Sequence, residues 1–203
     1  MIFYCLDIGG IHGLLFKQGF STTQKKINTI LGNIPFVQNP KGWTRKSTFA
    51  IGGFEYFGFS ETSDILVVLS AQGRGLIDMS KDEKIARDDS TDYILDETLL
   101  VCEGFDILEG ETIKLAGEFG GSLLPVKNKS NERLVRVSPF YPCEDVIFQP
   151  PFESCFIERY NKNCVRVYRG YLYCYGFSFS GKYFVIADDG GITFWEADHA
   201  KLL

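Results

Sequence analysis

The stretch Tyr175–Glu196, YGFSFSGKYFVIADDGGITFWE, contains the strongest local indication of fold in this chain. Two apolar runs, Tyr183–Ala187 and Ile192–Trp195, flank the tetrapeptide Asp-Asp-Gly-Gly at residues 188–191. Glycine and aspartate between β-forming runs favour a tight hairpin, because such a turn needs positive φ angles that most residues adopt only at a cost. The stretch therefore predicts two antiparallel strands, and its two aspartates are interpreted as turn residues rather than catalytic acids.

A fainter copy of this pattern lies earlier in the chain, where Ser60 is followed by an apolar run, by Gly73-Arg74-Gly75 and by a second apolar run. Similar short runs, separated by glycine, proline and asparagine, recur along the chain and predict further strands. The expected strands outside the first hairpin are Ile2–Leu6, Ser47–Ile51, Phe54–Phe59, Ile65–Leu69, Gly75–Met79, Thr98–Cys102, Thr112–Ala116, Arg133–Ser138, Val146–Gln149, Ser154–Glu158, Cys164–Tyr168 and Leu172–Phe177. We therefore expect a mainly β protein built of antiparallel sheets.

One short N-terminal helix is also indicated. Ser21 and Gln24 have the spacing of a capping box, in which each side chain bonds the backbone N–H of the other residue. Apolar residues at helical spacing follow, and Gly32 is expected to end the helix in the left-handed conformation.

Residues 175–196 resemble the edge of one blade of a WD-type β-propeller, and residues 56–78 form a weaker echo. Ser178–Gly181 is similar to the family's Ser-x-x-Gly turn, Asp189-Gly190 to its hairpin turn, and Trp195-Glu196 to its Trp-Asp pair. Glutamate replaces the final aspartate, and no Gly-His dipeptide opens a blade anywhere in the chain. The resemblance implies blade-like hairpins, with a small irregular β-propeller as the alternative to open antiparallel sheets.

The composition suits one β-rich domain over residues 1–203, with the polar loop 127–132 as the place where an internal boundary would fall. Six cysteines are expected to be buried, reduced thiols, because the N-terminus lacks a secretory signal and the protein is expected in the cytoplasm. No run of apolar residues is long enough for a membrane helix. The nearest two cysteines are nine residues apart and there are only two histidines, so neither a metal site nor a cofactor is expected.

The charge is unevenly distributed. Residues 78–118 contain 13 of the 26 acidic residues and only four basic ones, which gives this segment a net charge of −9 and the rest of the chain +4. Its densest part comprises Asp82, Glu83, Asp88, Asp89, Asp92, Asp96 and Glu97. An acidic face of this kind attracts and orients a basic partner, and the alternative is a solvated loop that aids solubility. Nucleic acid is not expected as a partner, because its recognition needs a basic surface.

A second candidate surface is rich in tyrosine. Tyr171, Tyr173 and Tyr175 alternate along one expected strand, and Arg169 precedes them. Alternation predicts that the three tyrosines share one face of the sheet. Such a face beside an arginine is typical of a protein interface, and the alternative is the partly buried outer face of a sheet.

These features favour a non-enzymatic, cytoplasmic protein-binding module that binds a basic partner, with no membrane or nucleic acid involved. In size and charge the chain is similar to bacterial immunity proteins, which neutralise toxins. The alternative is a small hydrolase that uses paired carboxylates across a cleft. Catalysis by histidine has few options, because only His12 and His199 are available.

Overall fold

The structure, a computed structural model, describes residues 21–90, 92–117 and 121–198. The predicted strand at residues 2–6 and both histidines lie outside them. The elements are α1 (Thr22–Gly32), β1 (Trp43–Phe49), β2 (Phe54–Phe59), β3 (Ile65–Ser70), β4 (Gly73–Asp78), β5 (Glu83–Asp88), β6 (Leu95–Asp96), β7 (Val101–Glu103), η1 (Asp106–Leu108), β8 (Thr112–Gly117), β9 (Arg133–Phe140), β10 (Cys143–Gln149), η2 (Glu158–Tyr160), β11 (Val165–Gly170), β12 (Leu172–Phe177), β13 (Tyr183–Asp188) and β14 (Gly191–Ala197).

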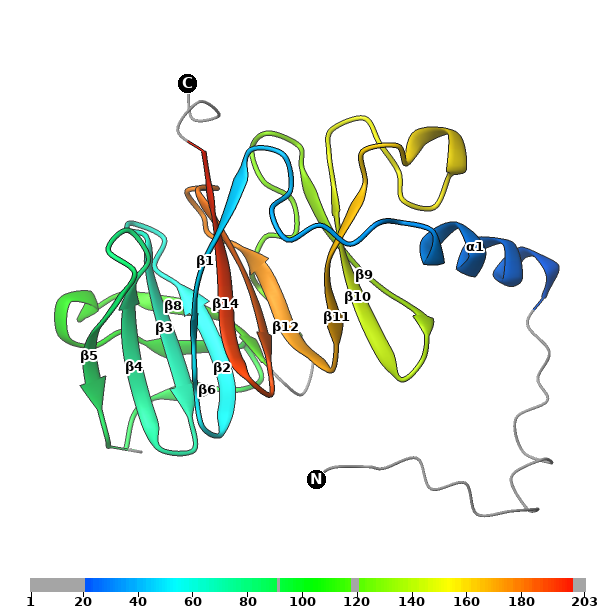
Figure 1. The fold of residues 1–203 in the computed structure, drawn as a ribbon. Helices are drawn as coiled ribbons and strands as arrows, with labels where there is room; N and C mark the ends of the chain where they lie inside the picture. Colours follow the sequence, from blue (N-terminus) through cyan, green and yellow to red (C-terminus); the bar gives the residue numbers. More distant parts are fainter. Residues whose placement is uncertain (1–20, 91, 118–120, 199–203) are drawn as a thin grey trace, which may run out of the picture.

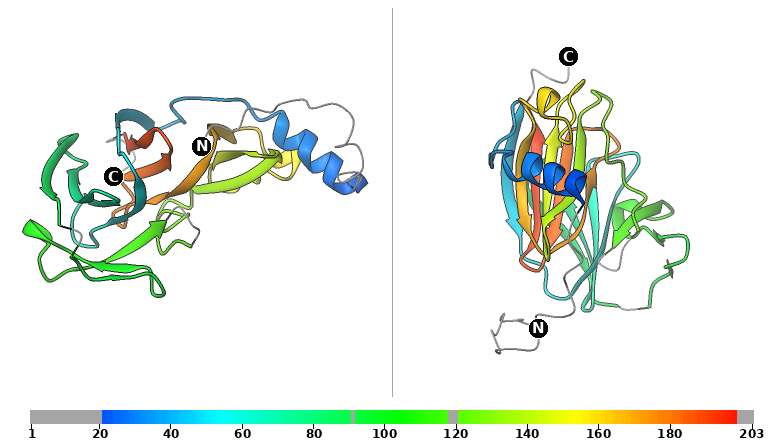
Figure 2. Two further views of the ribbon diagram at one scale, coloured as in Figure 1. Left: turned by 90° about the horizontal axis from the view of Figure 1, so that it is seen from below. Right: turned by 90° about the vertical axis from the view of Figure 1, so that its right-hand side faces the viewer.

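The strands form three antiparallel sheets that stand side by side, with α1 at one end of the molecule (Figure 1). Their strand orders are β11-β10-β9, β1-β14-β13-β12 and β5-β4-β3-β2-β8-β7-β6. The seven-stranded sheet bends round on itself as a half-barrel (Figure 2). Strand β1 pairs with β14, so a strand near the start of the described chain completes the sheet of the C-terminal hairpin. The prediction of a mainly β protein with antiparallel sheets and one helix is confirmed.

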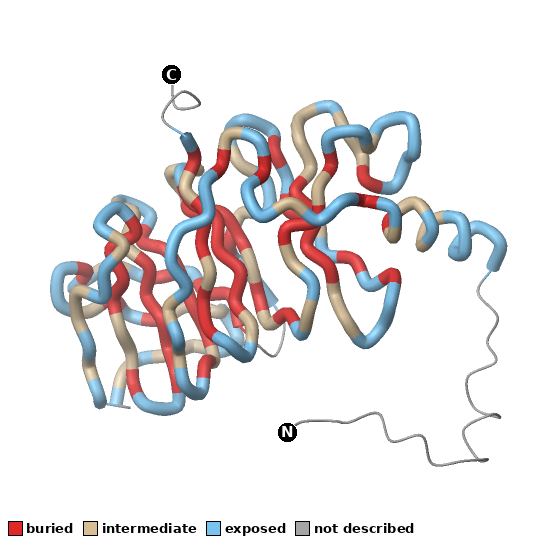
Figure 3. Tube along the Cα trace, in the orientation of Figure 1, coloured by how far each residue is buried: buried red, intermediate tan, exposed pale blue. Residues whose placement is uncertain are grey.

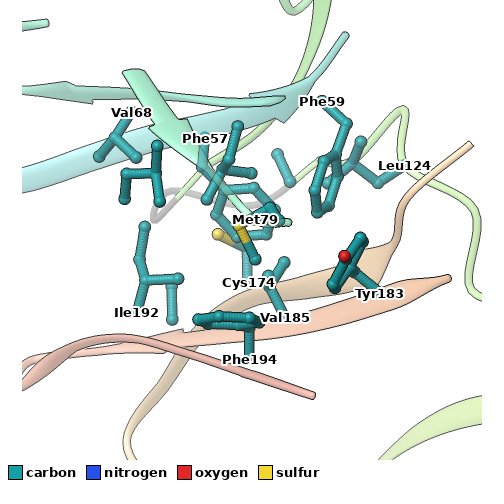
Figure 4. Close-up of a cluster of buried hydrophobic side chains, with 14 of the residues drawn as sticks. Phe57, Phe59, Val68, Met79, Leu124, Cys174, Tyr183, Val185, Ile192 and Phe194 are labelled. Atoms are coloured by element: carbon teal, nitrogen blue, oxygen red, sulfur yellow. The ribbon is translucent and has the colours of Figure 1, made fainter. Parts of the chain in front are cut away.

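The four-stranded sheet is covered on both faces, and β13 shows why its sequence is apolar throughout. Tyr183, Val185 and Ala187 belong to the cluster shared with the seven-stranded sheet. Figure 4 shows Tyr183 and Val185 on the side of this cluster opposite Phe57. The alternate residues, including Phe184, point into a second cluster shared with the three-stranded sheet. Because both neighbours are sheets, the central strands lie deep in the protein (Figure 3).

The repeated strand-turn-strand unit is confirmed in β2–β4 and β12–β14. Each unit has a two-residue loop followed by a glycine with positive φ, Gly73 at 105° and Gly191 at 128°. A Cβ atom at Gly191 would lie 2.1 Å from a backbone oxygen, so glycine is required there by space as well as by conformation. In each unit a buried serine, Ser60 or Ser178, follows the first strand, and its backbone N–H donates to the carbonyl of the first residue of the next strand.

The propeller alternative is not confirmed. The described residues form sheets of three, four and seven strands, whereas propeller blades are uniform four-stranded sheets. Among the same residues, no helix is both long and apolar enough to pass through a lipid bilayer.

The N-terminus of α1 has the predicted capping box. The backbone N–H of Ser21 donates to Gln24 Oε1 at 2.9 Å, and that of Gln24 donates to Ser21 Oγ at 3.2 Å. The predicted left-handed stop at Gly32 is wrong, because the helix ends in right-handed geometry at Asn33. Instead, the Arg166 guanidinium donates to the carbonyls of the last turn at 3.1 and 3.4 Å, which satisfies groups that a left-handed glycine otherwise helps to cap.

One predicted strand is wrong, and one edge strand was not predicted. Residues 154–158 form a loop in which the backbone N–H of Ser154 donates to the carbonyl of Tyr160 at 2.8 Å, so these residues bond within their own segment. Residues Glu83–Asp88, not predicted as a strand, form β5 at the edge of the seven-stranded sheet. Charged side chains along an edge strand hide the alternation from which strands are predicted.

Candidate binding surface

Arg74, on β4, fixes the curled end of the seven-stranded sheet. Its Nε atom bonds Asp88 Oδ2 at 2.9 Å, and its Nη1 atom donates to the carbonyl of Glu103 at 3.1 Å. The guanidinium also lies over two rings, 5.1 Å from the centre of Tyr93 and 4.4 Å from that of Phe105. These contacts join β5 to the segment that carries β6, β7 and η1, so the acidic segment is held as part of the fold.

Asp88 and Asp89, both predicted to bind a partner, have partners within the chain. Asp88 bonds Arg74 and also accepts the backbone N–H of Ser90 at 2.9 Å. The backbone N–H of Ser90 and the Arg74 guanidinium hold the pKa of Asp88 below its ordinary value. Asp89 pairs with Arg87 on the exposed surface. Asp88 is therefore part of the scaffold, whereas the exposed Asp89 pair contributes little to stability.

Three more predicted carboxylates accept hydrogen bonds that hold loops. Asp82 Oδ2 accepts the hydroxyl of Ser47 at 2.7 Å, and Glu97 Oε1 accepts that of Tyr56 at 3.4 Å. Asp96 Oδ1 accepts two backbone N–H groups of the following turn, at 2.9 and 2.8 Å. These interactions position the three carboxylates. Glu97 is exposed and Asp96 half-buried, whereas the Oδ1 atom of Asp82 is buried without a hydrogen-bond partner among the described residues.

Glu83 and Asp92 are exposed, and neither side chain has a hydrogen-bond or ion-pair partner among the described residues. The predicted set is not one patch. Asp82 and Glu83 lie at the start of β5, whereas Asp88 and Asp89 lie at its end, which is about 17 Å away for a strand of this length.

A groove of about 360 Å³ lies beside β6 and β7. Its lining residues are Ile94, Asp96, Val101, Cys102, Glu103, Gly110, Glu111 and Thr112, and they include three carboxylates and no lysine or arginine. Glu111 accepts the hydroxyl of Ser60 at 3.0 and 2.9 Å and the backbone N–H of Glu61 at 2.7 Å. The side chain of Glu103 is exposed and has no polar partner among the described residues. We call this feature the acidic groove.

Three large aliphatic side chains are exposed in the same segment. Ile94 is 70%, Leu99 63% and Ile107 61% exposed, and Ile94 also lines the acidic groove. Ile94 therefore adds apolar surface beside the carboxylates of the acidic groove. The sequence analysis missed Glu103, Glu111 and Ile94, although all three lie within the acidic segment that it identified.

The predicted tyrosine face is wrong. The β12–β13 register shifts between residues 172 and 174, which places Tyr173 and Tyr175 against different core clusters. The Tyr173 ring stacks on Phe54, with centroids 5.8 Å apart and planes 7° from parallel. Tyr171 is 56% exposed in the turn before β12. A bulge adds one residue to a strand, and therefore reverses the direction of every side chain beyond it.

Arg169 is bound to Asp145 in the fold. Its Nε and Nη2 atoms donate to the two oxygens of Asp145 at 2.6 and 2.8 Å, and its guanidinium lies 5.0 Å from the centre of the Phe140 ring. Asp145 is 1% exposed and also accepts Arg166 Nε at 2.8 Å. The residue predicted to bind a partner thus stabilises a buried carboxylate.

The cysteines of the described chain are free, and four of the five are buried. Burial raises the pKa of Cys102 and Cys155 to about 11 and that of Cys164 to about 12. Thiolates are the nucleophilic form, so these three thiols are poorly suited to catalysis at neutral pH. No group of three or more metal-binding side chains occurs among the described residues.

We expect Cys102, Cys155 and Cys164 to react with iodoacetamide at pH 8 about 100-fold or more slowly in the folded protein than in guanidinium chloride. The half-buried Cys143 is the internal control and should react faster than these three. Mass spectrometry of the labelled peptides over time measures each rate. Rapid labelling of any of the three in the folded state would contradict the burial described here.

Comparison with known proteins gives no functional assignment, so the assignment depends on the geometry of the acidic groove. No protein-family model matches the sequence, and no curated protein matches it either.

Proposed function

We propose that the protein is a binding module that holds a basic protein segment on the surface formed by β5–β8 and η1. The observation that carries this proposal is the acidic groove, in which three carboxylates and two aliphatic side chains line one cavity without a compensating cation. A segment with alternating cationic and apolar side chains is complementary to this lining.

Charge supports the proposal. Asp92 and Glu103 have no polar side-chain partner among the described residues, so a cationic ligand meets them without first displacing an internal ion pair. Glu97 is exposed and adds to the same negative potential. Such a field raises association rates and weakens as salt is added.

A binding role is favoured over the hydrolase alternative by the bonding of the groove carboxylates. Both oxygens of Glu111 accept hydrogen bonds from Ser60, and Asp96 Oδ1 accepts two backbone N–H groups. These bonds direct the oxygens of Glu111 and the Oδ1 atom of Asp96 at groups of the protein itself and fix the positions of both side chains. A hydrolase needs at least one carboxylic acid that can donate a proton to its substrate.

A more specific role of the immunity type, neutralising a basic toxin in the cytoplasm, is supported by the overall net charge of −5 and by the small size of the chain. Co-expression with the product of the adjacent gene tests it. Rescue of growth from a toxic neighbour supports this role, and binding of a basic peptide without any such rescue leaves only the more general module.

We expect the double variant Asp92→Lys/Glu103→Lys to weaken binding of a fluorescein-labelled peptide of alternating lysine and leucine about tenfold or more. Each reversal replaces an attraction by a repulsion worth about 1 kcal/mol in water at contact distance. Fluorescence anisotropy measures Kd at two salt concentrations. These positions are chosen because Asp88 pairs with Arg74, and its replacement would disturb the fold.

The matched control is Glu158→Lys, which makes the same charge change in η2, outside the acidic groove. The variant Ile94→Ser removes an apolar side chain of the groove and keeps every charge, and it should weaken binding as well. A peptide that binds the double variant and the control equally well would refute the proposal. So would equal binding of a peptide of alternating glutamate and leucine.

A further inference from the structure

A larger cavity lies between the three-stranded sheet and the loop that joins α1 to β1. Its volume is about 630 Å³, which is in the range of sites for small organic ligands. Half of its lining residues are apolar, and they come from the 37–41 loop and from the β10 and β11 ends: Val37, Phe148, Pro150, Pro151 and Val165. The polar lining residues are Asn39, Lys41, Glu132, Lys162 and Asn163.

The two lysines of this cavity come from segments far apart in the sequence. Lys41 lies on the α1–β1 connection and Lys162 on the loop before β11, and both are exposed. Neither has a hydrogen-bond or ion-pair partner among residues 21–90, 92–117 and 121–198. Asn163 is different, because its backbone N–H donates to Glu153 Oε2 at 2.9 Å. The cavity therefore has two available ammonium groups beside apolar walls.

Glu132 determines how an anionic ligand would be oriented in this cavity. It is 4% exposed, and its Oε2 atom accepts Trp43 Nε1 at 3.2 Å and Asn128 Nδ2 at 2.8 Å. This buried carboxylate repels an anionic group, whereas the exposed lysines attract one. A ligand with one anionic and one apolar end is thus oriented with the anion at the lysines and the apolar part between Phe148 and the prolines.

We infer that this cavity binds a small amphiphilic anion, an organic carboxylate or sulfonate with an aromatic or aliphatic body. The site is independent of the acidic groove, since the two share no lining residue and have opposite available charges. The test for the basic peptide and the test for the anion are therefore independent, and a negative result in one does not refute the other proposal.

The probe is 8-anilinonaphthalene-1-sulfonate, an aromatic monoanion whose fluorescence rises in apolar sites. We expect saturable binding at one site, displacement by decanoate, and no displacement by decyltrimethylammonium, which has a similar chain and the opposite charge. The variant Lys41→Glu/Lys162→Glu should weaken probe binding about tenfold or more, because two attractions become repulsions.

Two further variants locate the site. Val165→Trp fills the cavity while keeping both lysines and should abolish probe binding, and Val37→Phe is the second filling variant if the first does not fold. Lys25→Glu, on α1 and outside the cavity lining, is the matched control and should bind the probe as the unaltered protein does. Circular dichroism in the near ultraviolet confirms that each variant is folded.

Displacement by decanoate together with loss of binding in the lysine and filling variants supports the inference. Probe binding that persists unchanged in the Lys41→Glu/Lys162→Glu variant would overturn it. Absence of saturable binding, or equal displacement by the cationic detergent, would overturn it as well.

Discussion

Replacing Asp145 with alanine is expected to lower the free energy of unfolding by about 3–5 kcal/mol. Asp145 is 1% exposed and bonds both Arg166 and Arg169, and the Arg166 side chain is itself only 9% exposed. Without the carboxylate, the Arg166 guanidinium stays buried and loses its anionic partner. Arg166 also holds the last turn of α1, so the helix should lose part of its packing on the three-stranded sheet. Urea denaturation measures the change.

The neighbouring residue provides a matched control. Glu144 pairs with Arg136 through two bonds of 2.7 Å, but the Arg136 side chain is 42% exposed. Glu144→Ala should therefore cost at most about 1 kcal/mol. The double variant Asp145→Ala/Arg166→Met should be more stable than Asp145→Ala alone, because it no longer buries an unpaired charge. If Asp145→Ala costs no more than Glu144→Ala, the proposed role of this buried network is wrong.

Replacing Phe184 with alanine is the second large effect, with an expected loss of about 3–5 kcal/mol. Phe184 is completely buried on β13 and contacts four other rings. Its ring centre lies 4.6 Å from that of Trp195 and 4.9 Å from that of Trp43, and Phe148 and Phe177 complete the group. The truncated side chain leaves a cavity between two sheets whose backbones are fixed by hydrogen bonds, so the site cannot collapse to fill it.

Phe152→Ala removes the same atoms from a side chain that is 99% exposed, and its stability should remain within about 0.5 kcal/mol of the unaltered protein. Thermal unfolding by circular dichroism compares the two variants. Equal melting temperatures for Phe184→Ala and Phe152→Ala would mean that the cluster between the four-stranded and three-stranded sheets is not packed as described.

Local signals in the sequence are sufficient to predict the hairpins. Strands β2 and β12 have the bounds predicted for them, and the turn before Gly191 follows from residues that adopt turn geometry at little cost. The capping box of α1 is equally local, because both of its members lie within one helical turn. Features of this kind depend on neighbours in sequence, which a single chain displays directly.

Non-local contacts explain what the sequence analysis missed. Glu132 belongs to a polar segment predicted to be an exposed loop, yet it is buried because Trp43, 89 residues away, donates to it. The end of α1 is set by Arg166 rather than by Gly32, again through a partner distant in sequence. The bulge that separates Tyr173 from Tyr175 depends on pairing with β13, which the alternation of apolar residues does not reveal.

The same limit applies to the candidate site. Its acidic character could be predicted from charge counts alone, because those need no three-dimensional information. The sequence could not show which carboxylates remain available to a partner. Asp88 is bound by Arg74 inside the fold, and Glu103 lines the acidic groove only because the sheet curls. Charge density in the sequence thus indicates which segment forms the candidate site, and tertiary contacts determine which of its carboxylates are available for binding.

The pairing of β1 with β14 also determines how late in synthesis the fold can be completed. Once β8 has left the ribosome, the strands of the seven-stranded sheet are all present, but the face that carries Phe57 still lacks the strands that cover it. At about 5–20 residues per second, translation from β8 to the end of β14 takes on the order of 4–16 s. During that interval a broad apolar surface and an unpaired β1 are open to other nascent chains. We therefore expect the yield of folded protein in the cell to depend on chaperones that bind such surfaces until the last strand arrives.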